Sequence, residues 1–143
     1  MTPVKAVNHI GIAVRSIDAQ RPFYEGALGA IFEGTEVVPD QKVCVGFFRL
    51  GDVRLELLEP TDPSSTVAAF LEKRGEGLHH VAYTVEGIEA RIAELKQSGL
   101  RMIDEVPRPG AHHTRIAFIH PKSSLGVLTE LCEPVGDHAP ARN

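Results

Sequence analysis

Two stretches of the chain alternate bulky apolar residues with small or polar ones, which is the period-two pattern of a β-strand buried on one face. They span residues 6–14 and 79–85. Each places one histidine, His9 or His80, on a face of otherwise small side chains. The opposite faces carry the bulky residues Ile10, Ile12 and Val14, and Val81, Tyr83 and Val85. We expect a helix to pack on the bulky face, which leaves space beside each histidine.

A helix and three more strands follow each of these stretches. The helices are expected over about 17–28 and 87–98, each followed by a glycine, as is common just past a helix end. The strands are expected around 31–37, 43–50 and 53–59, and then around 101–106, 114–119 and 126–133. The segment "STVAAFLEKRG" begins at a Ser–Thr cap candidate and predicts a third helix that links the two halves.

The two halves repeat one module. The segment "NHIGIAVRSIDA" aligns with "HHVAYTVEGIEA" at an offset of 71, and "LELLEP" aligns with "TELCEP" at an offset of 74. The alignment places His9 on His80 and Glu56 on Glu130. It predicts a single α+β domain of tandem βαβββ modules, with a mixed, mostly antiparallel eight-stranded sheet and helices on the outside. Module one covers about 5–60, a linker helix 61–77, module two 78–134, and a frayed tail 135–143.

Composition excludes several classes of function. The 143 residues carry a net charge of -4 and no basic stripe, which argues against a nucleic-acid partner. No apolar run approaches the length of a membrane span, and the N-terminus "MTPVKAVNHI" has no pattern of a signal peptide. The two cysteines, Cys44 and Cys132, are far apart and lack a CxxC partner. We therefore expect a reduced, cytoplasmic protein without a membrane partner.

The paired histidines and glutamates point to a metal. A single histidine on a strand is more often a hydrogen-bonded core residue, and a single glutamate usually lies on a solvated face. At repeat-equivalent positions, however, His9, Glu56, His80 and Glu130 would converge on the pseudo-twofold axis of a duplicated sheet. Two buried carboxylates are costly without a counter-ion, which a divalent cation supplies. Imidazole with carboxylate suits zinc, nickel, cobalt, manganese or iron.

Four segments carry a family resemblance from Val7 to about Pro134: "NHIGIAV", "LGDVRLELLEP", "FLEKRGEGLHHVAYTV" and "FIHPKSSLGVLTEL". They resemble the vicinal oxygen chelate superfamily and, within it, the methylmalonyl-CoA epimerases. The first segment is common to the superfamily, whereas "KRGEGLHH" together with "HPKSSLGVLTEL" is much more specific to the epimerases. The resemblance implies a sheet curled around a metal cleft, in which the ion chelates two neighbouring oxygens of a substrate.

Site residues and partners follow from the same resemblance. It implies that His9, His80 and Glu130 are metal ligands, with Glu56 in the fourth position. The implied cofactor is one divalent ion per chain, cobalt first, with manganese, nickel or zinc as alternatives. The implied substrate is an acyl-CoA of propionate metabolism, and a homodimer is expected. The implied reaction interconverts (2R)- and (2S)-methylmalonyl-CoA through an enolate, with Glu130 and Glu56 as acid–base residues.

One position departs from part of the epimerase family. Some members carry a glutamate on the third strand that resembles a second acid–base residue, where this chain has Val45. A tight turn at Gly51–Asp52 would pair Phe47 with Glu56 and place Val45 diagonally across from Glu56 on the same face. We hypothesise that Glu56 takes over the missing role as ligand, base or both.

The sequence leaves open other functions of the same fold and the roles of several further residues. The same fold also serves glyoxalase-type isomerases, extradiol dioxygenases and non-catalytic binders of small ligands. The loop residues His112, His113, His120 and Lys122 are either solvated or in contact with substrate. Cys132 shares a strand face with Glu130 and is expected to be a packed thiol rather than a ligand.

Overall fold

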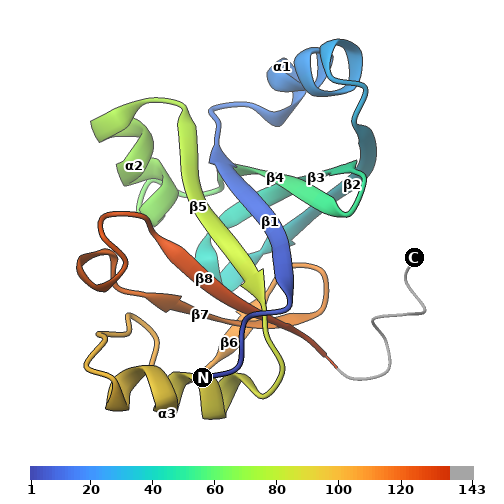
Figure 1. Cartoon of the computed structure of the whole chain (residues 1–143). Helices are drawn as coiled ribbons and strands as arrows, with labels where there is room; N and C mark the ends of the chain where they lie inside the picture. Colours follow the sequence, from blue (N-terminus) through green and yellow to red (C-terminus); the bar gives the residue numbers. More distant parts are fainter. Residues whose placement is uncertain (136–143) are drawn as a thin grey trace. The chain divides into compact units, whose positions relative to one another are not determined.

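The computed structural model describes residues 1–135, and of the expected tail only residue 135 falls within this range (Figure 1). The strands are β1 (Ala6–Ala13), β2 (Ile31–Val38), β3 (Val43–Leu50), β4 (Val53–Pro60), β5 (Gly77–Thr84), β6 (Arg108–Gly110), β7 (Thr114–Ile119) and β8 (Thr129–Pro134). The α-helices are α1 (Ile17–Arg21), α2 (Thr66–Arg74) and α3 (Ile88–Gln97). A π-helix (Pro22–Ala27) follows α1, and short 3₁₀ turns occupy Pro39–Gln41 and Pro121–Ser123. Among these residues, no helix is both long and apolar enough to cross a bilayer.

The strands form one mixed sheet in the order β2-β3-β4-β1-β5-β8-β7-β6. Within each module the first strand runs parallel to the last, β1 beside β4 and β5 beside β8. The remaining pairs within the modules, β2–β3, β3–β4, β6–β7 and β7–β8, are antiparallel. The predicted α+β class with a tandem βαβββ arrangement is confirmed.

The chain divides into two compact units, one of His9–His79 and the other of Met1–Asn8 with the chain from His80 onward. In the unit of His9–His79, the core forms where α1 meets β3 and β4. Its buried members are Val14, Ile17, Ala30, Phe48 and Leu57. The half-buried Ile12 packs against this cluster, so the bulky face of β1 receives the helix as the pattern predicted.

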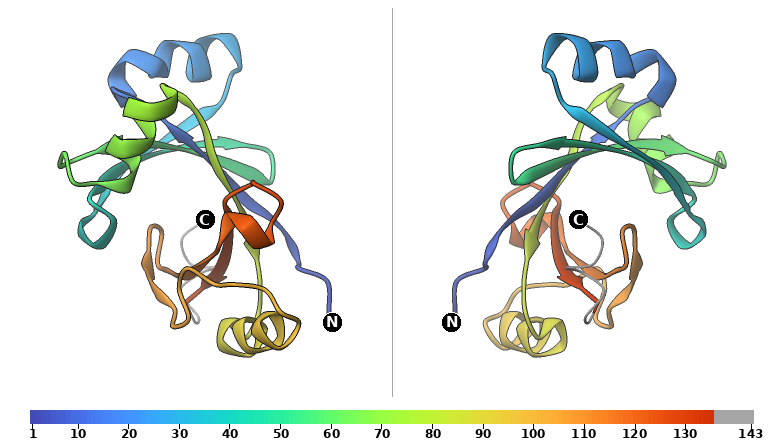
Figure 2. Two further views of the ribbon diagram at one scale, coloured as in Figure 1. Left: turned by 90° about the vertical axis from the view of Figure 1, so that its left-hand side faces the viewer. Right: turned by 90° about the vertical axis from the view of Figure 1, so that its right-hand side faces the viewer.

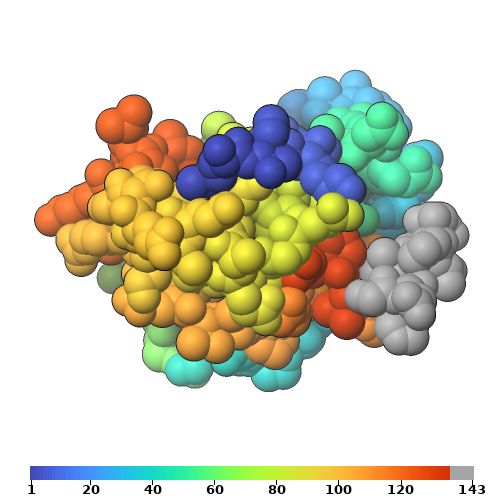
Figure 3. All heavy atoms as spheres, turned by 60° about the horizontal axis from the view of Figure 1, so that its bottom comes forward, coloured from blue at the N-terminus to red at the C-terminus, as the bar shows by residue number. Residues whose placement is uncertain are grey.

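The second unit has its own core beneath α3, which packs on β7 and β8 (Figure 2). Its buried members are Val85, Ile88, Ile92, Ala117, Ile119 and Leu131. The first residues of the chain lie across the surface of this unit (Figure 3). There Lys5 Nζ lies 2.9 Å from Glu86 Oε2, and the Arg91 guanidinium donates to the Thr2 carbonyl.

A glutamate on the last strand of each module holds the start of that module's helix. Glu59 Oε1 accepts from the Ile17 amide at 2.8 Å, and Glu133 Oε2 accepts from the Gly87 amide at 2.6 Å. Helix N-termini expose amide donors that need acceptors. A carboxylate there also interacts favourably with the positive end of the helix dipole. The repeat therefore extends to how each helix is anchored.

The first predicted helix is present, but its hydrogen-bonding pattern changes in its second half. The α-helix ends at Arg21, and residues 22–27 continue as a π-helix in which the Leu28 amide donates to the Phe23 carbonyl. Pro22 has no N–H with which to continue the α-helical ladder. The wider turn follows directly from that break.

Two strand boundaries in the second module also differ from prediction. The sixth strand is Arg108–Gly110 rather than 101–106, and Met102 makes only an isolated bridge to Ile119. The amides of Ile103 and Asp104 both point to the Phe118 carbonyl, so this segment bends instead of extending the ladder. Strand β8 begins at Thr129 rather than 126, because Gly126 has φ +91° and the Val127 amide closes a turn on Ser124.

Candidate metal centre

In the unit of His9–His79, parallel pairing brings His9 and Glu56 onto one face of β1 and β4. Gly11 is the partner of Glu56 in the register, and the absence of a side chain there leaves room for the carboxylate. His9 Nδ1 lies 3.3 Å from Glu56 Oε2, and both residues are about 5% exposed. A buried imidazole and a buried carboxylate are thus held in direct contact.

The predicted pairing across the Gly51–Asp52 turn is confirmed. Phe47 lies opposite Glu56, and Val45 lies opposite Leu58, one pair further along the same face. An apolar side chain therefore occupies the position at which some epimerases carry a glutamate.

Sequence reasoning missed Arg54 at this face. Arg54 pairs with His9 in the register and precedes Glu56 by two residues on β4, so the strand period places it on the same side. Its Nη1 lies 3.6 Å from Glu56 Oε2, and its guanidinium carbon lies 5.9 Å from the centre of the Phe47 ring. The period-two rule applied to β4 could have found it.

The second unit repeats the arrangement with a closer pair. His80 Nε2 lies 2.9 Å from Glu130 Oε1, and both side chains are about 5% exposed. Phe118 lies opposite Glu130 in the register and makes an edge-to-face contact with His80, with ring centres 5.4 Å apart. Arg108 lies with its guanidinium carbon 5.8 Å from the Phe118 ring centre. Each module therefore supplies a histidine, a glutamate, a phenylalanine and an arginine.

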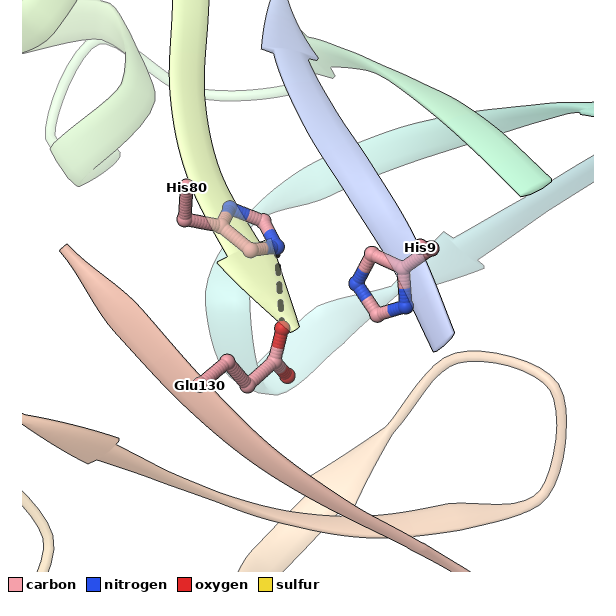
Figure 4. Close-up of side chains that lie close together, drawn as sticks. All are labelled: His9, His80 and Glu130. Atoms are coloured by element: carbon pink, nitrogen blue, oxygen red, sulfur yellow. Dashed lines mark ion pairs between the residues drawn. The ribbon is translucent and has the colours of Figure 1, made fainter. Parts of the chain in front are cut away.

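Three of the four predicted ligands form a group that could hold a metal ion. His9, His80 and Glu130 each offer a ligand atom, and these atoms lie within 4.8 Å of one another (Figure 4). Glu56 is not a member of this group, although it contacts His9. Imidazole and carboxylate donors are those that zinc, cobalt, nickel, manganese and iron accept, and a dication would offset the buried carboxylate charge. The donor set therefore fits a divalent metal.

The loop candidates lie in turns outside this group. His112 and His113 form the turn between β6 and β7, both with φ near +60°. His120 Nδ1 accepts from the Lys122 amide at 3.1 Å and so caps the 3₁₀ turn that contains Lys122. Cys132 is a buried thiol that packs with Ala82, Ile116 and Phe118. The metal-ligating and catalytic roles assigned from sequence stay predictions.

Comparison with known proteins gives concordant matches. Residues 8–118 match the glyoxalase/bleomycin resistance protein/dioxygenase superfamily. The chain is 49% identical over 131 residues to the uncharacterised protein YqjC of Bacillus subtilis, covering 92% of this chain and 94% of that protein. It is 37% identical over 126 residues to human mitochondrial methylmalonyl-CoA epimerase, covering 87% of this chain and 72% of that protein. The crystal structure of methylmalonyl-CoA epimerase from Mycobacterium tuberculosis superimposes with a TM-score of 0.91 at 35% identity, covering 98% and 97% of the two chains.

Proposed function

Since this chain belongs to the glyoxalase/bleomycin resistance protein/dioxygenase superfamily, we propose that it is a metal-dependent epimerase that interconverts (2R)- and (2S)-methylmalonyl-CoA. The observation that carries the proposal is the buried group of His9, His80 and Glu130, whose ligand atoms lie within 4.8 Å of one another. The similarity to methylmalonyl-CoA epimerases over most of the chain supports the choice of substrate.

His9, His80 and Glu130 would hold the ion, with Glu56 as the fourth protein ligand. When bound, the divalent ion supplies Lewis-acid stabilisation for the negative charge that develops on the substrate oxygens. The two imidazoles bind as neutral donors, so negative charge from the protein comes from whichever of the two carboxyl groups is ionised. Burial of all four side chains keeps bulk water from the reacting α-carbon and strengthens every electrostatic contact there.

Inversion at the α-carbon needs one group to remove a proton and another to return a proton to the opposite face. Glu56 and Glu130 are the carboxylates that we assign to this exchange, because they lie on the last strands of the two modules and are both buried. A carboxylate oxygen of one takes the α-proton, and the carboxylic acid of the other delivers its proton to the enolate carbon. Val45 supplies no titratable group at the third strand, which leaves Glu56 as the candidate from that module.

Proton NMR of (2R)-methylmalonyl-CoA in deuterated water tests the proposal. We expect the α-proton signal to disappear with metal-replete protein, and to persist after the metal is removed with a chelator. Glu130→Gln and Glu56→Gln should each slow the exchange by about 10²-fold or more, the usual contribution of a positioned acid–base group. Full exchange by Glu56→Gln would contradict its assignment. No α-proton loss from (2R)-methylmalonyl-CoA with the metal-replete wild type would contradict the epimerase.

Two outcomes would redirect the assignment within the superfamily. Turnover of a hemithioacetal, or oxygen consumption with a catechol, would favour the isomerase or dioxygenase chemistry instead. Tight binding of ligand by protein that carries no metal would favour a non-catalytic binder. The expected homodimer belongs to this proposal and is tested by light scattering of the purified protein.

A further inference from the structure

Arg54 is a cation that the proposed chemistry has not yet used. It lies on β4, on the sheet face that also carries His9 and Glu56. Its side chain is about one-quarter exposed, so the guanidinium is largely desolvated yet reachable. Removing an arginine from water without satisfying its donors is costly, so its contacts need explanation.

Two carboxylates lie close to the guanidinium. Glu56 Oε2 lies 3.6 Å from Nη1, and Glu33 Oε1 lies 3.8 Å from Nε, both beyond hydrogen-bond distance. Glu33 already accepts from Arg49 Nε at 2.8 Å. Nε of Arg54 is buried and has no hydrogen-bond partner among the described residues.

Two other arginines of the same unit, Arg49 and Arg21, have carboxylate acceptors. Arg49 donates to Glu33, and Arg21, which stacks on Phe32 at 3.7 Å, donates to Glu25 at 2.6 Å. Arg54 alone among these three combines a ring contact, two acidic neighbours and an unused buried donor. An arginine fork of this kind matches the two oxygens of a carboxylate.

We infer that Arg54 binds the free carboxylate of the substrate thioester and so selects a carboxylated acyl-CoA over its uncarboxylated analogue. The inference rests on the proposed function, because it takes the substrate to be a 2-carboxyacyl-CoA. Glu56 serves the metal in that proposal, and Glu33 is held by Arg49. The positive charge of Arg54 is then balanced by the substrate carboxylate. This carboxylate is attached to the α-carbon, whose proton Glu56 exchanges in the proposed function.

Calorimetric binding of two thioesters to the full-length protein tests this role. Methylmalonyl-CoA carries the carboxylate and propionyl-CoA lacks it, whereas both carry the same CoA phosphates. Arg54→Met should weaken methylmalonyl-CoA binding by about 10- to 100-fold, the usual effect of losing a charge-assisted hydrogen bond, and leave propionyl-CoA binding within about twofold. The affinity of Arg54→Lys for methylmalonyl-CoA should fall between those of the wild type and Arg54→Met, because lysine keeps the charge but loses the guanidinium fork. The measurement is repeated after chelation, where the difference between the ligands should still depend on Arg54.

Arg21→Met is the matched control, since it also removes an arginine from a phenylalanine ring and a carboxylate. It should change neither affinity. Equal weakening of both thioesters by Arg54→Met would mean contact with the CoA portion and would overturn the inference. So would unchanged affinities in Arg54→Met. If Arg54→Met does not fold by circular dichroism, Arg54→Lys decides: wild-type selectivity for the carboxylated ligand overturns the inference.

The α-proton exchange assay distinguishes failure of this inference from failure of the proposed function. Wild-type exchange combined with unchanged selectivity in Arg54→Met defeats only the role of Arg54. Absence of exchange in the wild type defeats the epimerase, and the role of Arg54 falls with it.

Discussion

Arg115 shows how one side chain ties a helix to a strand in the second unit. Its guanidinium donates to both carboxylate oxygens of Glu89, at the start of α3, and to Glu133 Oε1 on β8 at 2.6 Å. The hydrogen bonds that Arg115 donates to Glu89 and, to a lesser extent, to Glu133 raise the pKa of Arg115 above its ordinary value. The hydrogen bond from Arg115 in turn lowers the pKa of Glu89. Arg115 thus links the helix start to the strand that carries Glu130.

This contact predicts a pH dependence of stability. Glu89 has a lower pKa in the folded state than in the unfolded chain, where a glutamate titrates near pH 4.3. The ion pair of Arg115 with Glu89 therefore stabilises the fold above about pH 4.3. This contribution is lost as the pH falls through the pKa that Glu89 has in the folded state. We expect Arg115→Met to return the pKa of Glu89 toward its ordinary value, as measured by carbon NMR titration of the carboxyl group. The difference in free energy of unfolding between Arg115→Met and the wild type should shrink below about pH 4.

Lys96→Met is the control for Arg115→Met. Lys96 pairs with Glu105 at 2.6 Å on the surface and contacts neither Glu89 nor Glu133. It should leave the titration of Glu89 unchanged. An identical Glu89 titration in Arg115→Met and wild type would contradict the proposed coupling.

At the scale of elements, the docking of α1 on β3 depends on a glycine. A Cβ added at Gly46 would lie 2.9 Å from Ile17 Cγ2, closer than such atoms approach. Gly46 lies opposite Leu57 in the register, on the face that forms the core of this unit. The close approach of helix and strand requires that this position have no side chain.

Gly46→Ala should lower the free energy of unfolding by about 1–3 kcal/mol, because the core must shift to admit the methyl group. Urea denaturation measures the change. Gly26→Ala is the control, since a Cβ there meets nothing within 4 Å, and it should be neutral or slightly stabilising. The cost of Gly46→Ala should also diminish in an Ile17→Ala background, as a double-mutant cycle would report. Full additivity of the two changes in free energy of unfolding would show that contact with Ile17 does not cause the destabilisation.

At the scale of the whole molecule, the proposed metal centre takes its ligands from residues far apart in the sequence. His9 lies on β1, whereas His80 lies on β5 and Glu130 on β8. An ion that binds only the folded protein stabilises it by mass action, by about 2.7 kcal/mol when its free concentration is 100 times its Kd. We expect added divalent metal to raise the Tm of the wild type and to have much less effect on either His9→Ala or His80→Ala, by calorimetry.

His120→Asn is the control for these two variants. It removes an imidazole that caps a turn, and asparagine preserves the cap. Its Tm should rise with metal as in the wild type. Retention of the full metal effect in His9→Ala would mean that the ion binds without His9.

Much of the architecture was determined by the sequence alone. Period-two alternation and the repeat offsets of 71 and 74 led to the module order, and the tight turn at Gly51–Asp52 led to the Phe47–Glu56 register. These features are local or repeated, so they leave a pattern in the residues themselves. The same pattern singled out His9, His80 and Glu130 before any contact was known.

Only the tertiary structure decided which groups meet those residues. The short sixth strand follows from the hydrogen bonds of residues 103 and 104 to the distant Phe118, and no local pattern encodes them. The unsatisfied donor of Arg54 likewise depends on Glu33 being taken by Arg49 from another strand. Propensity and periodicity report how a segment folds on itself. Competition for a hydrogen-bond partner depends on segments that are brought together only in the folded chain.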